Sequence, residues 1–214
     1  MSGYGKTNFT QIAGITYCTK KSITHHLSAI TYQLSPINYQ LSTISYHPSP
    51  MNSPFPKYHP QSKVWIYQSN RMLNTVEAQQ VESAANTFVK QWAAHGHPLA
   101  AGADLIHNRF LILCVNAEHQ SASGCSIDAS VHFIQQLGQK HQIDFFDRMN
   151  IAYIDHEQLI NTVHFNKIKS HFQEGLIKED TLIFNNTWTN LQDFQNKWQQ
   201  PLSESWLKNK IPVS

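Results

Sequence analysis

The feature that most constrains the fold is the run FLILCV at residues 110–115, which is apolar at every position. A strand with one face in water alternates apolar and polar residues, whereas a strand buried on both faces is apolar throughout. The run therefore predicts a strand in the centre of a sheet, with both of its faces buried.

Two elements are expected before this strand. The segment KVWIYQS at residues 63–69 alternates its side chains and is rich in strand-forming residues, so we expect a first strand there. Asn74 precedes Glu77 by three residues, which is the spacing of a helix N-cap and its reciprocal partner. Apolar residues at helical spacing follow as far as Trp92, and Gly96 is expected to end this helix.

Further elements follow at short intervals. Residues 99–116 predict a hairpin with a tight turn around His107 and Asn108. A second helix is expected to begin near Ser126 and Asp128, both candidate caps, and residues 145–155 read as another strand.

This order of elements predicts a ferredoxin-like βαββαβ core over residues 63–155, which is a four-stranded antiparallel sheet with two helices on one face. Residues 156–214 then add an αβα extension, with a helix that ends at Gly175, a strand at 181–184 and a helical layer at 188–207. We expect residues 51–214 to form one α+β domain.

The distribution of charged residues differs between this domain and residues 1–50. All 14 acidic residues follow position 76, and three of the 16 basic residues precede position 51, so residues 51–214 hold 13 basic and 14 acidic residues. Such a balance does not suit nucleic-acid binding, and we expect no nucleic-acid partner.

Residues 1–50 contain a seven-residue repeat, ITYQLSP, INYQLST and ISYHPSP, at 30–50. Prolines interrupt it and it lacks flanking charges, so it does not predict a coiled coil. We interpret residues 1–50 as translated from a start upstream of the true one, at Met51, or else as a disordered tail.

The chain has three cysteines in neither CxxC nor zinc spacing, no signal-peptide core and no apolar run that could span a membrane. Isolated thiols are typical of a reducing compartment, so we expect a soluble cytoplasmic protein without a membrane segment.

Several segments resemble a family of small, functionally uncharacterised bacterial proteins that commonly carry the label "ABC transporter ATPase". They are VWIYQSNR (64–71), HNRFLILCVN (107–116), SGCSIDASVHFI (123–134), FFDR (145–148) and DTLIFNN (180–186). The resemblance covers Lys63 to about Trp206 and implies no particular activity or catalytic residue.

The residues do not support that label. A phosphate-binding loop needs Gly, four residues, then Gly-Lys-Ser/Thr, and the only Gly-Lys-Thr here begins at Gly5, too early for the first glycine. Asn116 follows the apolar strand where an ATPase carries its magnesium-binding Asp. We therefore expect no ABC-type ATPase and no bound cofactor.

Cys125 lies where the second helix is expected to begin. Unpaired backbone N–H groups at a helix N-terminus lower the pKa of a thiol, so Cys125, with Asp128 or a nearby His, is a candidate for the catalytic residues of a cysteine-dependent enzyme. The alternative is a small, buried structural residue, because cysteine is among the most buried residue types.

Histidines suggest a metal site as a further candidate. The expected topology places His95, His97, Cys125 and His156 at one edge, but no pair has the spacing of a zinc site, and we expect no metal.

Polar residues gather at the opposite edge of the expected sheet. They are Gln68, Asn70, Arg71, Asn108, Arg109, Asp147 and Arg148. Converging guanidinium and amide groups suit an anionic ligand, although turn formation and pairing of Arg148 with Asp147 or Asp144 are the alternatives. A small-ligand or partner-binding module is therefore the leading interpretation, with Asn70, Arg71, Asn108, Arg109 and Arg148 as ligand-binding candidates.

One further segment, residues 165–184, loosely resembles small peptide-binding modules through Gly175, Ile177 and the run Asp180–Leu182. It suggests a peptide-binding adaptor as another alternative.

Overall fold

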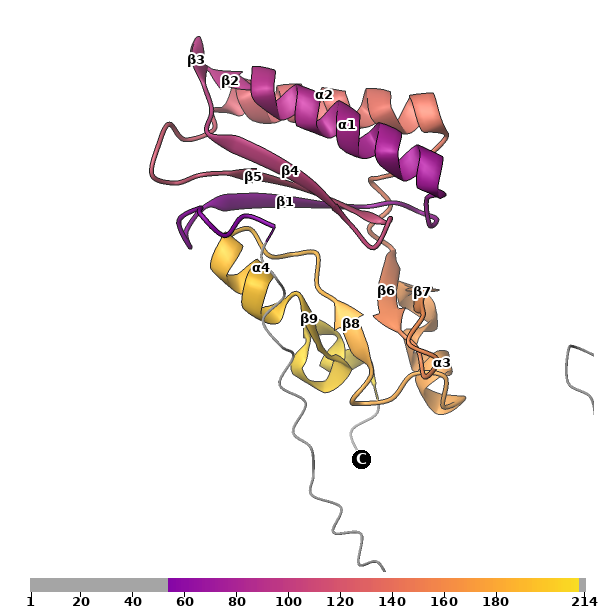
Figure 1. Ribbon diagram of the computed structural model, residues 1–214. Coiled ribbons are helices and arrows are strands. Elements are labelled where there is room, and N and C mark those ends of the chain that lie inside the picture. The colour runs from indigo at the N-terminus through magenta and orange to yellow at the C-terminus, as the bar shows by residue number, and fades with distance from the viewer. Residues whose placement is uncertain (1–53, 212–214) are drawn as a thin grey trace, which may run out of the picture. The chain divides into compact units, whose positions relative to one another are not determined.

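The computed structural model describes residues 54–211, which form an α+β structure of helices and antiparallel sheets (Figure 1). The expectations for residues 1–50, including the repeat, lie outside this range. Among the described residues, no helix is both long and apolar enough to cross a bilayer.

The first sheet contains β1 (Lys63–Gln68), β4 (Ala101–Ile106) and β5 (Phe110–Val115) in the order β1-β5-β4. Both pairings are antiparallel, and β5 lies in the centre with all six residues buried. The prediction from FLILCV is confirmed.

Two long helices, α1 (Thr75–Gln91) and α2 (Gly124–His141), cover one face of this sheet (Figure 1). The predicted capping box of α1 is present, because Asn74 accepts from the backbone of Glu77 and Glu77 accepts from that of Asn74. The start of α2 differs from the prediction: Ser123 is the N-cap, Ser126 is its reciprocal partner, and Asp128 lies inside the helix.

A short hairpin follows α1. Its strands β2 (Ala93–Ala94) and β3 (His97–Pro98) are joined by His95 and Gly96, which both have positive φ. Gly96 therefore forms a tight turn, and the prediction that it ends the helix is wrong. The second hairpin turn, between β4 and β5, lies at His107 and Asn108 as predicted, both with positive φ.

The second sheet has the order β7-β6-β8-β9, with antiparallel pairs. Its strands are β6 (Asn150–Ile154), β7 (Ile160–His164), β8 (Leu182–Phe184) and β9 (Gln199–Pro201). The predicted strand at 145–155 thus begins only at Asn150, and β7 and β9 were not predicted.

The ferredoxin-like strand order is not formed, because β6 belongs to the second sheet instead of pairing with β1. The edge of β1 is partly occupied by a distant segment: Lys63 forms a bridge with Asn190, and the Val64 amide donates to the Thr189 carbonyl at 3.0 Å. The chain after α2 leaves the first sheet and starts a new one.

The remaining elements differ in part from the predicted αβα extension. They are the 3₁₀ helix η1 (Phe165–Lys167), α3 (Ile168–Gln173), α4 (Leu191–Lys197), and the 3₁₀ helices η2 (Leu202–Glu204) and η3 (Trp206–Lys210). Gly175, with φ +73°, follows α3, and β8 lies where a strand was predicted.

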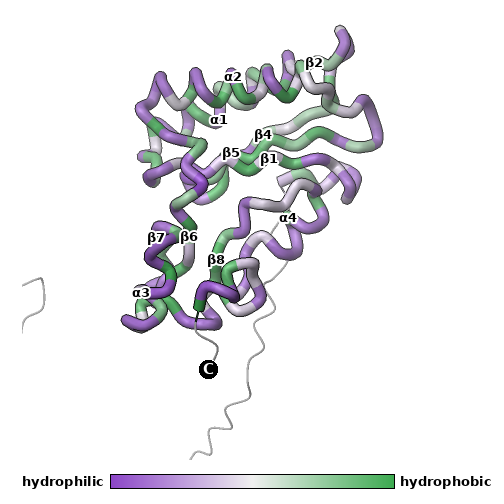
Figure 2. Tube along the Cα trace, turned by 180° about the vertical axis from the view of Figure 1, so that it is seen from behind, coloured by the Kyte–Doolittle hydropathy of each residue, from purple (hydrophilic) through white to green (hydrophobic). Residues whose placement is uncertain are grey.

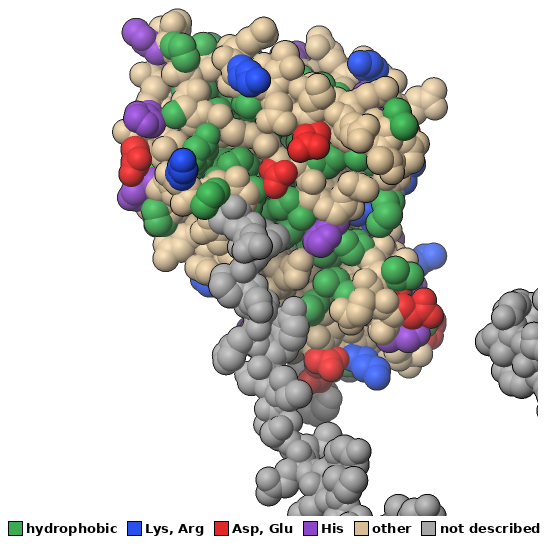
Figure 3. Space-filling view, viewed as in Figure 1, with side chains coloured by type: hydrophobic (Ala, Val, Ile, Leu, Met, Phe, Trp, Pro, Cys, Tyr) green, Lys and Arg blue, Asp and Glu red, His purple; other side chains and the backbone are tan. Residues whose placement is uncertain are grey.

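This C-terminal part covers the face of the first sheet that α1 and α2 leave open. Phe110, Ile112 and Cys114 of β5 pack there with Phe184 and Trp198, while the alternate residues of β5 pack beneath the helices. Apolar residues accordingly gather along the strands of the first sheet (Figure 2). On the face shown in Figure 3, charged side chains of both signs lie scattered, without a basic patch.

Candidate functional site

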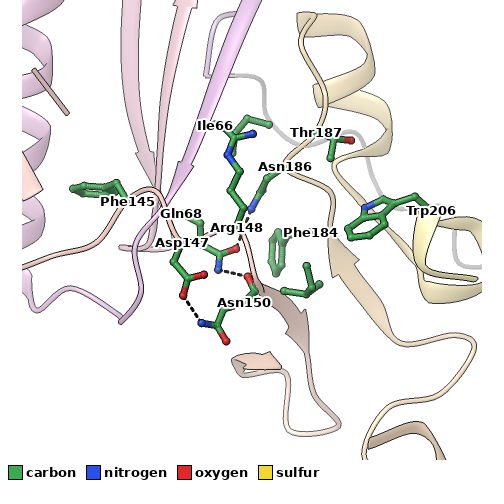
Figure 4. A pocket seen from close by; sticks show the side chains of 11 residues that line it. Ile66, Gln68, Phe145, Asp147, Arg148, Asn150, Phe184, Asn186, Thr187 and Trp206 are labelled. Carbon is green, nitrogen blue, oxygen red and sulfur yellow. Dashed lines mark hydrogen bonds between the residues drawn. The ribbon is translucent and has the colours of Figure 1, made fainter. Parts of the chain in front are cut away.

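A small pocket lies where the first sheet meets the second, with a cavity volume of about 70 Å³. It is lined by Ile66, Gln68, Phe145, Asp147, Arg148, Asn150, Ile151, Phe184, Asn186, Thr187 and Trp206. These residues come from the end of β1, the link from α2 to β6, β6 itself, the end of β8 with the following loop, and η3 (Figure 4).

A chain of side-chain hydrogen bonds crosses this junction. Trp198 donates through Nε1 to Asn186 Oδ1, Asn186 donates through Nδ2 to Gln68 Oε1, and Gln68 donates through Nε2 to the Asn150 carbonyl, each at 2.9 Å. Gln68 is only 6% exposed, so its amide needs these partners. The chain joins both sheets and leaves one N–H of each of the two side-chain amides without a hydrogen bond to the described residues.

Asp147 has a fixed position at one side of the pocket. Its carboxylate accepts from the Met149 amide at 2.8 Å and from the Asn150 side chain. The backbone hydrogen bond from Met149 is the main cause that lowers the pKa of Asp147, and the bond from Asn150 adds to it. Asp147 is thus an anion near neutral pH.

Arg148 is exposed and forms no hydrogen bond or ion pair with any residue of 54–211. Its side chain extends between Ile66 and Asn186 in Figure 4. The alternative in which Arg148 pairs with Asp147 or Asp144 is not observed, because no ion pair among the described residues includes Arg148. The guanidinium is left available for a ligand.

The structure brings three of the predicted edge residues, Gln68, Asp147 and Arg148, into the pocket and places the others elsewhere. Arg71 forms a bidentate pair with Glu77, with two N–O distances of 2.7 Å, and also donates to a backbone carbonyl of α2. Its hydrogen-bonding capacity is largely used within the fold.

Asn70 and Asn108 have structural positions. Asn70 exchanges two hydrogen bonds with the backbone of Asp144, at 2.9 and 3.1 Å, and Asn108 forms the hairpin turn with φ +49°. Arg109 is 7% exposed, and its burial lowers the pKa of the guanidinium. Its Nε and Nη1 have no partner, but the side chain does not line the pocket.

The two described thiols differ in environment. Cys125 is exposed in the first turn of α2, whereas Cys114 is buried in β5, where burial raises its pKa to about 12. Asp128 follows Cys125 within the same helix and is exposed. The interpretation of Cys125 as a buried structural residue is wrong, because the side chain lies at the surface.

The histidines of residues 54–211 do not assemble into a metal site. Within residues 54–211, no group of three or more His, Cys, Asp or Glu side chains is arranged to hold a metal ion. His95 and His97 belong to the β2–β3 hairpin, and His156 is an exposed neighbour of Glu157 in the turn between β6 and β7.

Sequence reasoning missed most of the other pocket and support residues, among them Asn150, Asn186, Trp198 and Trp206. Asn186 had a usable signal, because it follows the strand LIF just as Gln68 ends the first strand. The hydrogen bond between Asn186 and Trp198 depends on tertiary contacts, and no sequence pattern indicated it.

Comparison of the chain with protein-family models, with curated proteins and with solved structures gave no match.

Proposed function

We propose that the chain is a small-ligand-binding module that holds the oxyanion of its ligand, a carboxylate or phosphate, in the pocket beside Arg148. The observation that carries the proposal is the unpaired Arg148 guanidinium in a pocket with free amide N–H groups. A guanidinium and amide donors together match the acceptor geometry of carboxylate and phosphate groups.

An ATPase of the ABC type is not supported. Phosphate-binding loops open a helix after a strand, whereas β1 leads through Ser69–Asn74 to α1 without the required glycines and lysine. Asn116, after β5, accepts hydrogen bonds from the backbones of His59 and Glu118, so it has a structural role.

No observation favours either alternative, the cysteine-dependent enzyme or the peptide-binding adaptor. No described side chain makes a hydrogen bond that would activate Cys125, and Asp128 is exposed on the helix. In the peptide-module segment, Ile177 is buried and Thr181 accepts from the Lys178 amide, so both have structural roles. The two unpaired described thiols support a cytoplasmic setting.

Thermal unfolding with a panel of inorganic phosphate, carboxylates and nucleotides tests the proposal. A ligand at 100 times its Kd stabilises the folded state by about 2.7 kcal/mol, which raises the Tm by roughly 5–10 °C. Arg148→Gln removes a charge-assisted interaction and weakens binding about 10- to 100-fold.

Arg71→Gln is the matched control, because it removes a guanidinium that is already paired with Glu77. It lowers the starting Tm and leaves the ligand-induced shift intact. The proposal is wrong if no anion stabilises the protein more than sodium chloride at equal ionic strength, or if Arg148→Gln keeps the full shift.

A further inference from the structure

The wall of the pocket contains an unusually exposed aromatic side chain. Trp206, in η3, is 47% exposed although it lines the pocket, and its Nε1 makes no hydrogen bond with the described residues. Figure 4 shows the indole on the side of the pocket opposite Asp147 and Phe145. A large apolar ring left in water at a pocket mouth is a surface that a ligand can cover.

The indole is held in place from outside the pocket. Phe165, which does not line the pocket, stacks on Trp206 with ring centroids 5.8 Å apart and planes 17° from parallel. Lys210 places its Nζ 4.6 Å from the centroid of Phe165, and the Phe165 amide donates to the Met149 carbonyl at 2.7 Å. Because its support is fixed, the free part of the indole is ordered before a ligand arrives, which lowers the entropy cost of binding.

The charges of the lining restrict what can bind. Among the eleven lining residues, Arg148 is the one cation and Asp147 the one carboxylate. One guanidinium with free amide N–H groups satisfies a single oxyanion, whereas a polyphosphate chain would bring further negative charge toward Asp147. A ligand with one anionic group fits better than a polyanion.

From these observations we propose that the ligand is a small aromatic compound with a single anionic group, whose flat ring stacks on Trp206 while its carboxylate or phosphate monoester lies at Arg148. The proposal rests on the proposed function and adds the class of ligand. Stacking of the ring supplies selectivity that the anion alone does not, because a saturated ring of equal charge cannot lie flat on the indole.

The experiment titrates the full chain with benzoate, with its saturated counterpart cyclohexanecarboxylate, and with phenyl phosphate, and follows the ¹H–¹⁵N indole resonances by NMR. Benzoate is expected to bind about 3- to 10-fold more tightly than cyclohexanecarboxylate and to shift the Trp206 indole signal. Comparison of benzoate with phenyl phosphate tells which oxyanion the site prefers.

Trp206→Leu should reduce the ratio of the cyclohexanecarboxylate Kd to the benzoate Kd to nearly one, while cyclohexanecarboxylate still binds. Trp188→Leu is the control, because Trp188 is a partly exposed tryptophan outside this pocket whose Nε1 donates to the Lys197 carbonyl. It should leave the preference unchanged, and assigning the lost signal in each variant identifies the two indoles.

The outcomes separate the two proposals. Equal affinity of the wild type for benzoate and cyclohexanecarboxylate, or an undiminished preference in Trp206→Leu, overturns the aromatic ligand while anion binding at Arg148 stands. If none of the three probes binds, or if Arg148→Gln binds them all normally, the anion site itself is wrong and the aromatic ligand falls with it.

Discussion

Replacing Gln68 by Met tests whether the hydrogen-bond chain at the pocket holds the two sheets together. Methionine keeps nearly the length of the side chain but neither donates nor accepts as an amide does. The change leaves Asn186 Nδ2 and the Asn150 carbonyl without the partners that now lie 2.9 Å away. Each orphaned polar group costs about 1–3 kcal/mol when buried, and water entering the pocket mouth offsets part of the cost.

We therefore expect Gln68→Met to lower the free energy of unfolding by about 2–4 kcal/mol. Urea unfolding followed by circular dichroism measures this directly, and the Tm should fall by roughly 5–15 °C. Gln61→Met is the matched control, because the Gln61 amide meets only Gln192, at 3.3 Å in an exposed pair. Its expected effect is within about 0.5 kcal/mol.

A loss in Gln68→Met no larger than that in Gln61→Met would refute the reasoning. Such a result would mean that water replaces the Gln68 amide at no cost and that apolar packing alone joins the sheets.

Three further changes probe other parts of the structure. Gly138→Ala places a Cβ 2.6 Å from the Ile143 carbonyl oxygen, so overpacking outweighs the better helix propensity of alanine. Urea unfolding should show that the free energy of unfolding falls by about 1–2 kcal/mol. A stabilised variant would contradict this contact. The hydrogen bond from Arg71 holds the pKa of Glu77 at about 2, below its ordinary 4.5, so this stabilisation is present above about pH 4.5 and is lost as the pH falls toward 2. Glu77→Gln should flatten the dependence of stability on pH in that window, and parallel curves would disprove the pairing in solution. Cys125 should react with a maleimide in the native protein, as peptide mapping would show, and labelling only in denaturant would contradict its exposure.

Features encoded by neighbouring residues were predictable. The buried strand β5 follows from six consecutive apolar residues, and the start of α1 follows from Asn74 and Glu77, three positions apart. The helix end was misplaced because His95 and Gly96 can form either a helix cap or a hairpin turn, and the choice depends on the pairing of β2 with β3.

The candidate site was predictable only in part. Placing polar residues at the ends of strands selected Gln68, Asp147 and Arg148 correctly as neighbours. The same rule also selected Arg71, because it does not consider nearby partners that compete with a ligand. Glu77, six residues further along the chain, accepts hydrogen bonds from both Nη atoms of this guanidinium.

The pocket itself depends on the departure from the predicted strand order. If β6 paired with β1, as in the ferredoxin-like arrangement, the link that carries Asp147 and Arg148 would run to the edge of the first sheet, and β8 would not meet the end of β1. The segment at Thr189 and Asn190 instead occupies part of the β1 edge, and β6 pairs with β8 through Tyr153. The corner that results brings Arg148 beside amides of both sheets, so a variant that loosens this corner should lose the proposed anion binding before it loses the helical layer.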